Sequence, residues 1–387
     1  MINLSLTQLK FILLLPNFIL IFLFLKFLLK KYNINIAHFI GGQLVLVLIF
    51  LEFYYYGNHN SYEWVTSGDI PILIKFLDEE SLKLDFYTNA IFNSPKIIFY
   101  YIIYLFIENF NLGLDYALFL FKSIQIFLVP LLAYYVLIGF INLKNDYLII
   151  LLTTLIILFS SGYFDFILYY AKIGIGSFTS WKSLSPQTFS FVLGLTSILL
   201  YRNNFFIFSL ILLFIVSIIH IFSGLVFLIL HFIFFNNLDN KKNYFLFLLT
   251  KIYKMKYQFL VFLSAMLIIK NYFVNEIPEN FFEIYVLERH PHHYLVSSFF
   301  NFYSFLFISI PGISILVANY LNKKILMYQS LNIFLFFYLC ILIQYFGSEV
   351  LQFNFITLLG PTRFLSISIF LIIYLFIQLF NSFFKKN

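Results

Sequence analysis

The chain has 387 residues, of which 62% are hydrophobic and only 11% are charged. A soluble globular protein is nearer half apolar and a quarter charged. This chain therefore has too little polar surface to cover a body folded in water, and lipid is its natural solvent. The composition excludes a soluble nucleotide enzyme and predicts an all-α, polytopic integral membrane protein.

The polar residues exclude some kinds of site. The net charge is +7, but the basic residues form short clusters between apolar segments rather than one face, so we expect no nucleic-acid partner. The single cysteine, Cys340, lies inside an apolar run, which excludes a disulfide framework and a thiolate metal site. Residues 1–31 lack the basic start and the cleavage site of a signal peptide, and we expect a retained first span there.

Apolar segments follow one another along the whole chain, which predicts a transmembrane helix bundle. A helix needs about 20 apolar residues to cross a hydrocarbon core of about 30 Å. By this measure we predict about 11 spans, several of them short. They are residues 9–29, 37–56, 115–141, 147–161, 187–201, 204–219, 221–235, 257–274, 297–320, 326–346 and 363–384.

The segment 204–235 decides the orientation of everything after it. As one helix of 32 residues it would reach about 48 Å, too long without heavy tilt, whereas a hairpin needs a turn at residues 220–224. Basic residues concentrate in cytoplasmic loops, and only the hairpin keeps the later clusters on the side of Lys30. We therefore expect a hairpin, an outer N-terminus and a cytoplasmic C-terminus. The basic residues then inside are Lys144, Arg202, Lys241, Lys242, Lys251, Lys254, Lys256, Lys323, Lys324, Lys385 and Lys386.

This topology leaves four loops on the outer side, at residues 57–96, 162–186, 275–296 and 347–362. Residues 97–108 are too few to cross the membrane, and their tyrosines favour a helix at the outer interface. On the other side, the lysines of residues 251–256 predict a surface helix against anionic lipid.

Two acids of the first outer loop are candidate general bases. Asp69 lies in a turn-like context between a glycine and a proline, and Asp85 has apolar neighbours. A carboxylate near the low-dielectric boundary is more easily protonated and can accept a proton from a substrate. The alternative for both is a solvated acid, which is the preferred interpretation of the nearby run Asp78-Glu79-Glu80.

The third outer loop carries the run Glu288-Arg289-His290-Pro291-His292-His293-Tyr294. Arginine gives paired contacts to phosphate oxygens, and histidine donates to phosphate, moves a proton or binds a metal. The histidine spacing does not match the usual helical zinc pair, so we assign no metal and favour anion binding over a purely structural turn. Lys122 and Arg363 are cations in or beside spans, where they have a partner or snorkel to the interface. His220 is interpreted as structural.

The order of these parts resembles the C-type superfamily of membrane glycosyltransferases, the GT-C fold. In that family a span leads to an outer loop with a catalytic acid, followed by an interfacial helix and a helix pair with a basic cytoplasmic turn. Residues 37–235 follow this order, which makes 37–387 a GT-C-like transmembrane domain and 1–36 an extra N-terminal span. The run that begins at Arg289 also resembles an Arg-x-Pro-His-His-Tyr-like motif of a bacterial polytopic membrane family.

The resemblance implies transfer of a sugar from a polyprenyl-phosphate carrier at the outer face of a bacterial inner membrane. Asp69, or alternatively Asp85, would be the catalytic base, and the phosphate would be bound by Arg289, His290, His292, His293 and Arg363. The partners would be the lipid-linked sugar and membrane lipids, with no certain cofactor and a divalent metal still compatible. Two alternatives stay open, a polymerase or ligase of surface polysaccharide and a lipid or glycan transporter (flippase).

Overall fold

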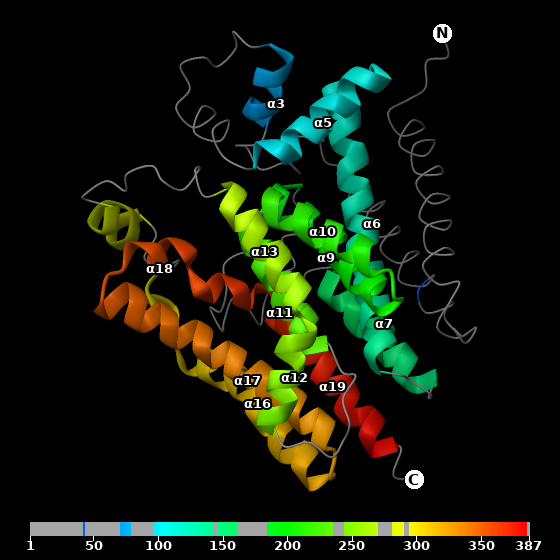
Figure 1. The fold of residues 1–387 in the computed structure, drawn as a ribbon, viewed down its shortest axis with the longest axis vertical. Coiled ribbons are helices and arrows are strands. Elements are labelled where there is room, and N and C mark those ends of the chain that lie inside the picture. Colours follow the sequence, from blue (N-terminus) through cyan, green and yellow to red (C-terminus); the bar gives the residue numbers. More distant parts are fainter. Residues whose placement is uncertain are drawn as a thin grey trace. The chain divides into compact units, whose positions relative to one another are not determined.

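The computed structural model describes residues 42, 70–78, 96–141, 146–160, 184–234, 244–269, 281–289 and 294–384. Every regular element in these ranges is a helix, which confirms the all-α prediction (Figure 1). The chain divides into two units, residues 1–136 with 181–224 and residues 137–180 with 225–387. Apart from Gly42, the expected spans 9–29 and 37–56 lie outside the described residues.

Three of the described helices are long and apolar enough to cross a membrane. They are α6 (Leu114–Ile141), α16 (Phe302–Tyr320) and α17 (Lys324–Gln344), which continues into the π-helix η5 (Tyr345–Val350). Helices α12 (Tyr244–Lys254) and α13 (Lys256–Ile269) form a fourth candidate, bent by 56°. These candidate spans agree with the prediction of a helical membrane protein. The count of about 11 spans remains a prediction.

Several other apolar helices are too short to cross the bilayer alone. Helices α5 (Ile97–Phe110), α10 (Phe206–Ile219) and α11 (Ile221–Phe234) have 14 residues each. A helix rises 1.5 Å per residue, so each is about 21 Å long against a core of about 30 Å. The short length of α5 agrees with the expected non-spanning helix, whereas α10 and α11 were expected to be spans.

The core of the first unit forms where helix α3 (Ile70–Leu77) packs against α5. One face of α5 is buried there, and the Phe76 and Tyr104 rings stack with centroids 5.3 Å apart. Helix α3 begins directly after Asp69, in a segment that the sequence predicted only as a loop. The buried cluster comprises Ile72, Leu73, Phe99, Tyr100, Ile103, Ile107, Ala117, Leu118, Phe121, Leu184 and Ile219.

Hydrogen bonds fix the start and the partner of helix α9 (Pro186–Arg202). Ser185 and Thr188 form a reciprocal capping box at its N-terminus, which satisfies two otherwise unpaired backbone donors. Farther along α9, the Ser197 hydroxyl donates to the Ser209 carbonyl (2.9 Å) and the Ser209 hydroxyl donates to the Ser197 carbonyl (2.8 Å). This pair joins α9 to α10 at a point where small side chains let the two backbones approach closely.

Helices α10 and α11 meet at His220, within the residues 220–224 where the sequence predicted a turn. His220 has an extended backbone (φ −152°, ψ 97°), and its Nδ1 accepts the Ser223 backbone N–H at 3.2 Å. A Cβ added to Gly224 would lie 2.7 Å from Cα of Ser217, seven residues earlier. Seven residues of continuous helix would separate these positions by about 10 Å. The helix is therefore sharply broken at His220, whose side chain caps the second helix, in agreement with its structural interpretation. The hairpin itself remains a prediction.

In the second unit, α16 and α17 run side by side (Figure 1). Asn301 and Ser304 form a capping box that starts α16 at Phe302, so the expected span 297–320 is divided, with residues 296–299 forming a separate short helix. The other helices of this unit are α7 (Asp146–Ser160), η4 (Phe281–Arg289), α15 (Val296–Phe299), α18 (Asn354–Leu359), η6 (Pro361–Ile367) and α19 (Ser368–Phe384).

The prediction of a surface helix at residues 251–256 is wrong for Lys251. Its side chain is fully buried, and its Nζ donates to the Ile233 carbonyl (3.2 Å) and lies 4.8 Å from the centre of the Phe232 ring. A cation at the last turn of a helix satisfies a carbonyl that has no partner within the helix. Lys251 therefore fastens α12 to the end of α11, while Lys254 and Lys256 are exposed.

Candidate functional site

Most of the predicted site residues lie outside the described ranges. Asp69, Asp85, His290, His292 and His293 lie outside them. Arg289 is the last residue of η4, and Arg363 lies within η6, which places the backbone of both in the second unit. The expected convergence of the two acids with the 289–293 turn therefore remains a prediction.

The residue that ends the histidine run is anchored to helix α17. Tyr294 is only 2% exposed, and its carbonyl accepts a hydrogen bond of 2.6 Å from Nε2 of Gln344. Gln344 is itself fully buried and also donates to the Ser348 hydroxyl at 2.8 Å. A buried carbonyl needs a donor, so the last residue of α17 fixes the position of Tyr294 at the end of the run.

A second contact joins the third outer loop to the fourth. The backbone N–H of Ser297, in the short helix α15, donates to Oε1 of Glu349 in η5 at 3.0 Å. Helices α15 and η5 pack against each other at the same end of α17. The two loops were both expected on the outer side, and the structure brings them together at one end of one candidate span.

The segment that carries Arg363 folds back on α17. Helix α18 packs tightly on η5, since a Cβ added to Gly347 would collide with the Ile356 side chain. Gly360 then reverses the chain in a left-handed conformation (φ 51°, ψ 64°) that glycine adopts without strain, and η6 packs against α17. The segment that contains Arg363 is thus built on α17, as is Tyr294 at the end of the histidine run.

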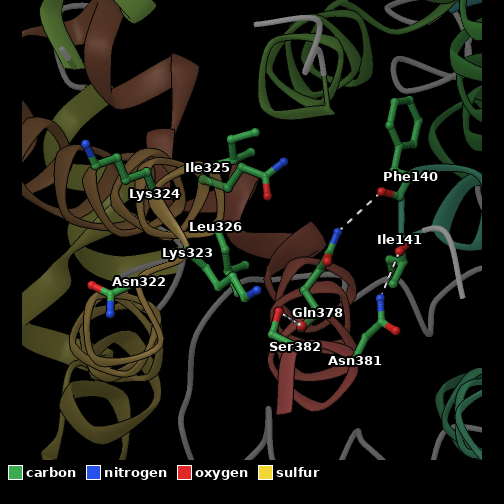
Figure 2. A pocket seen from close by; sticks show the side chains of 11 residues that line it. Phe140, Ile141, Asn322, Lys323, Lys324, Ile325, Leu326, Gln378, Asn381 and Ser382 are labelled. Carbon is green, nitrogen blue, oxygen red and sulfur yellow. Dashed lines mark hydrogen bonds between the residues drawn. The ribbon is translucent and has the colours of Figure 1, made fainter. Parts of the chain in front are cut away.

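The opposite end of α17 lines a pocket of about 670 Å³ that the sequence did not predict. Nε2 of Gln378 and Nδ2 of Asn381 donate to the last carbonyls of α6, at Phe140 (3.3 Å) and Ile141 (3.1 Å) (Figure 2). The lining residues are Phe140, Ile141, Asn322, Lys323, Lys324, Ile325, Leu326, Gln329, Gln378, Asn381 and Ser382. The sequence signal that could have indicated this pocket is the presence of amide side chains, such as Gln378 and Asn381, inside an apolar segment.

The two ends of α17 differ in what surrounds them, while the sidedness itself remains a prediction. About 30 Å of helix separates Lys324 from Gln344. Residues near the expected cytoplasmic clusters at Lys144, Lys323 and Lys385 line the pocket at the first end, and the expected outer loops meet at the second. Among the described residues, no group of three or more metal-ligating side chains occurs.

The Gln344 anchor gives a test of whether the turn must be held in place. Gln344→Leu keeps the side-chain volume but leaves the Tyr294 carbonyl without its donor, and losing such a buried bond costs about 1–3 kcal/mol. We expect a lower unfolding midpoint in detergent and increased proteolysis within 288–296. Gln378→Leu is the matched control. It removes an amide of α19 that lies in the pocket at the other end of α17, and it should leave proteolysis of residues 288–296 unchanged.

The chain was also compared with known proteins. No protein-family model, no curated protein and no solved structure matches it.

Proposed function

We propose that this protein is a membrane glycosyltransferase that uses a polyprenyl-phosphate-linked sugar at the outer face of a bacterial inner membrane. The observation that carries the proposal is the hydrogen bond from Gln344 of α17 to Tyr294, the last residue of the 288–294 run. A rigid helix that fixes one end of a cation-rich segment is suited to position a phosphate leaving group.

The proposed chemistry divides the work between a base and several cations. Asp69, or alternatively Asp85, accepts the proton of the acceptor hydroxyl as the oxygen attacks the sugar. Negative charge develops on the departing polyprenyl phosphate, where Arg289, His290, His292, His293 and Arg363 stabilise it. Such groups accelerate the reaction only if they bind the transition state more tightly than the substrate.

The direct test is an assay of the purified full chain in lipid vesicles with a set of polyprenyl-phosphate-linked sugars. We expect sugar transfer to an acceptor and release of polyprenyl phosphate, both dependent on the protein. Failure to consume any donor, together with movement of intact lipid-linked sugar across the bilayer, would instead identify a transporter.

A specific observation favours the transporter as the second candidate. Helix α17 buries polar atoms that have no hydrogen-bond partner among the described residues: Nε2 of Gln329, Oγ of Ser330, Nδ2 of Asn332 and Oε1 of Gln344. Polar groups inside a membrane bundle commonly mark a path for a polar substrate. These buried polar atoms of α17 are the observation that favours transport.

The proposed orientation has its own test. Cysteines introduced at Ser61 and Asn243 should react with an impermeant thiol reagent from opposite sides of the membrane, the first from outside intact cells and the second only after permeabilisation. The native Cys340 is buried and should contribute little background. Equal labelling of both positions in intact cells would reject the proposed topology.

A further inference from the structure

The pocket at the Lys324 end of α17 is not used by the proposed transferase reaction. Its volume of about 670 Å³ is within the size range of small-molecule sites, roughly 300–1,000 Å³. It is lined by the α16–α17 turn and by the ends of α6 and α19, all within the second unit. A pocket formed by helix ends presents backbone and side-chain polar groups together with apolar walls.

The positive charge of the pocket comes from the start of α17. Lys323 is the N-cap residue and provides no side-chain cap, so the first-turn N–H groups point out of the helix uncapped. The positive end of the helix dipole adds to the charge of Lys323 and Lys324. Figure 2 shows the Lys323 side chain extending toward Gln378 and Ser382, whereas Lys324 points away from them.

A buried donor supplies an independent indication of a ligand. Gln329 lines the pocket and is only 2% exposed, and its Nε2 has no hydrogen-bond partner among the described residues. A buried amide N–H without an acceptor costs about 1–3 kcal/mol, which a bound acceptor would recover. Gln329 therefore favours a ligand that brings oxygen acceptors into the pocket.

The other lining residues narrow the chemistry of that ligand. None of them is acidic, and the structure describes all of them, so nothing in the lining opposes a negative charge. Apolar walls from Phe140, Ile141, Ile325 and Leu326 suit a carbon-bearing group beside the anion. The expected cytoplasmic side is where basic pockets between membrane helices bind anionic headgroups.

We propose that this pocket binds a phosphate group through Lys323, Gln329 and the first turn of α17. The phosphate belongs either to an anionic lipid headgroup or to a soluble phosphate compound. Both sources offer the same charge and acceptor oxygens, and they differ in whether an apolar chain accompanies the phosphate. This phosphate-binding proposal does not depend on the proposed sugar-transfer reaction, because its test measures binding of the ligand and not enzyme activity.

The test measures ligand-induced thermal stabilisation of the purified full chain in detergent. Three probes are titrated: short-chain dihexanoylphosphatidylglycerol, the zwitterionic dihexanoylphosphatidylcholine, and inorganic phosphate. We expect Lys323→Gln and Gln329→Leu each to weaken binding of the preferred anion on the order of tenfold. Lys254→Gln, which removes the same charge from an exposed position of α12, should change that affinity less than twofold.

The outcomes separate the two sources. Binding of phosphatidylglycerol but not inorganic phosphate, weakened by both pocket variants, supports a lipid headgroup. Binding of inorganic phosphate with the same sensitivity supports a soluble ligand. Equal binding by the wild type and both pocket variants, or no preference for phosphatidylglycerol and phosphate over phosphatidylcholine, overturns the proposal. If Lys323→Gln does not fold, Gln329→Leu decides alone, since it removes an unpaired buried donor and should not lower ligand-free stability.

Discussion

Arg289→Lys should lower the rate of sugar transfer by roughly 30- to 1000-fold even though the positive charge is retained. Lysine is a point donor and cannot reproduce the planar, two-pronged contact of a guanidinium with phosphate oxygens. The measurement is kcat/KM of the purified full chain for the polyprenyl-phosphate-linked donor. If Arg289 only stabilises the end of η4, the variant should instead lower folded yield and leave specific activity unchanged.

The companion substitution Asp69→Asn separates turnover from binding. An amide keeps the shape of the carboxylate but cannot accept a proton, so kcat should fall roughly 10²- to 10⁴-fold while donor affinity changes little. Asp78→Asn is the matched control, because Asp78 has the same chemistry and directly follows α3. Normal kcat in the Asp69 variant would move the catalytic base to Asp85 or reject the carboxylate mechanism, and Asp85→Asn distinguishes these two.

The second large effect concerns stability at the break between α10 and α11. Gly224→Ala places a methyl group 2.7 Å from Cα and 2.8 Å from Cβ of Ser217, closer than real atoms approach. Overpacking of this kind costs about 1–3 kcal/mol, and the backbone of the tight turn has little room to move. We expect a lower free energy of unfolding in mixed detergent micelles. Ser217→Ala should not rescue the variant, because the obstruction includes the Ser217 backbone.

Gly312→Ala is the matched control for this prediction. Gly312 lies inside α16, where an added methyl group would meet only the Phe334 ring, at 3.3 Å and 3.4 Å. The ring can shift slightly, and alanine is favoured over glycine inside a helix by roughly 1 kcal/mol. The control should therefore be neutral or stabilising. Equal losses at Gly224 and Gly312 would contradict the close approach of Gly224 to Ser217.

Length and hydropathy alone predicted several features that the structure confirms. The helical class follows from the composition, because apolar segments cannot leave backbone groups unpaired in lipid. The break at His220 follows from length, since one helix over 204–235 would be too long without heavy tilt, whereas the hairpin and the orientation inferred from charge remain predictions. The short α5 follows in the same way from the small number of apolar residues between polar ones.

Other features depend on contacts between residues far apart in sequence. Lys251 was expected at a surface because lysines are usually solvated, yet it pairs with a carbonyl 18 residues earlier. The early break before α16 comes from a capping interaction of Asn301 that hydropathy averages over several residues conceal. The Gln344–Tyr294 bond spans 50 residues and has no local sequence pattern.

The sequence by itself predicted a lipid environment and the helical class of this protein, because these depend on composition. It also gives the order of the charged segments, because that depends on spacing along the chain. Only the tertiary structure decided which loop is held at which end of α17, and that Gln329 lines a basic pocket with an unpaired donor. The physical reason is that helix pairing satisfies particular polar atoms at particular distances. Hydropathy gives the length of each helix but carries no information about the partner that each buried polar group meets.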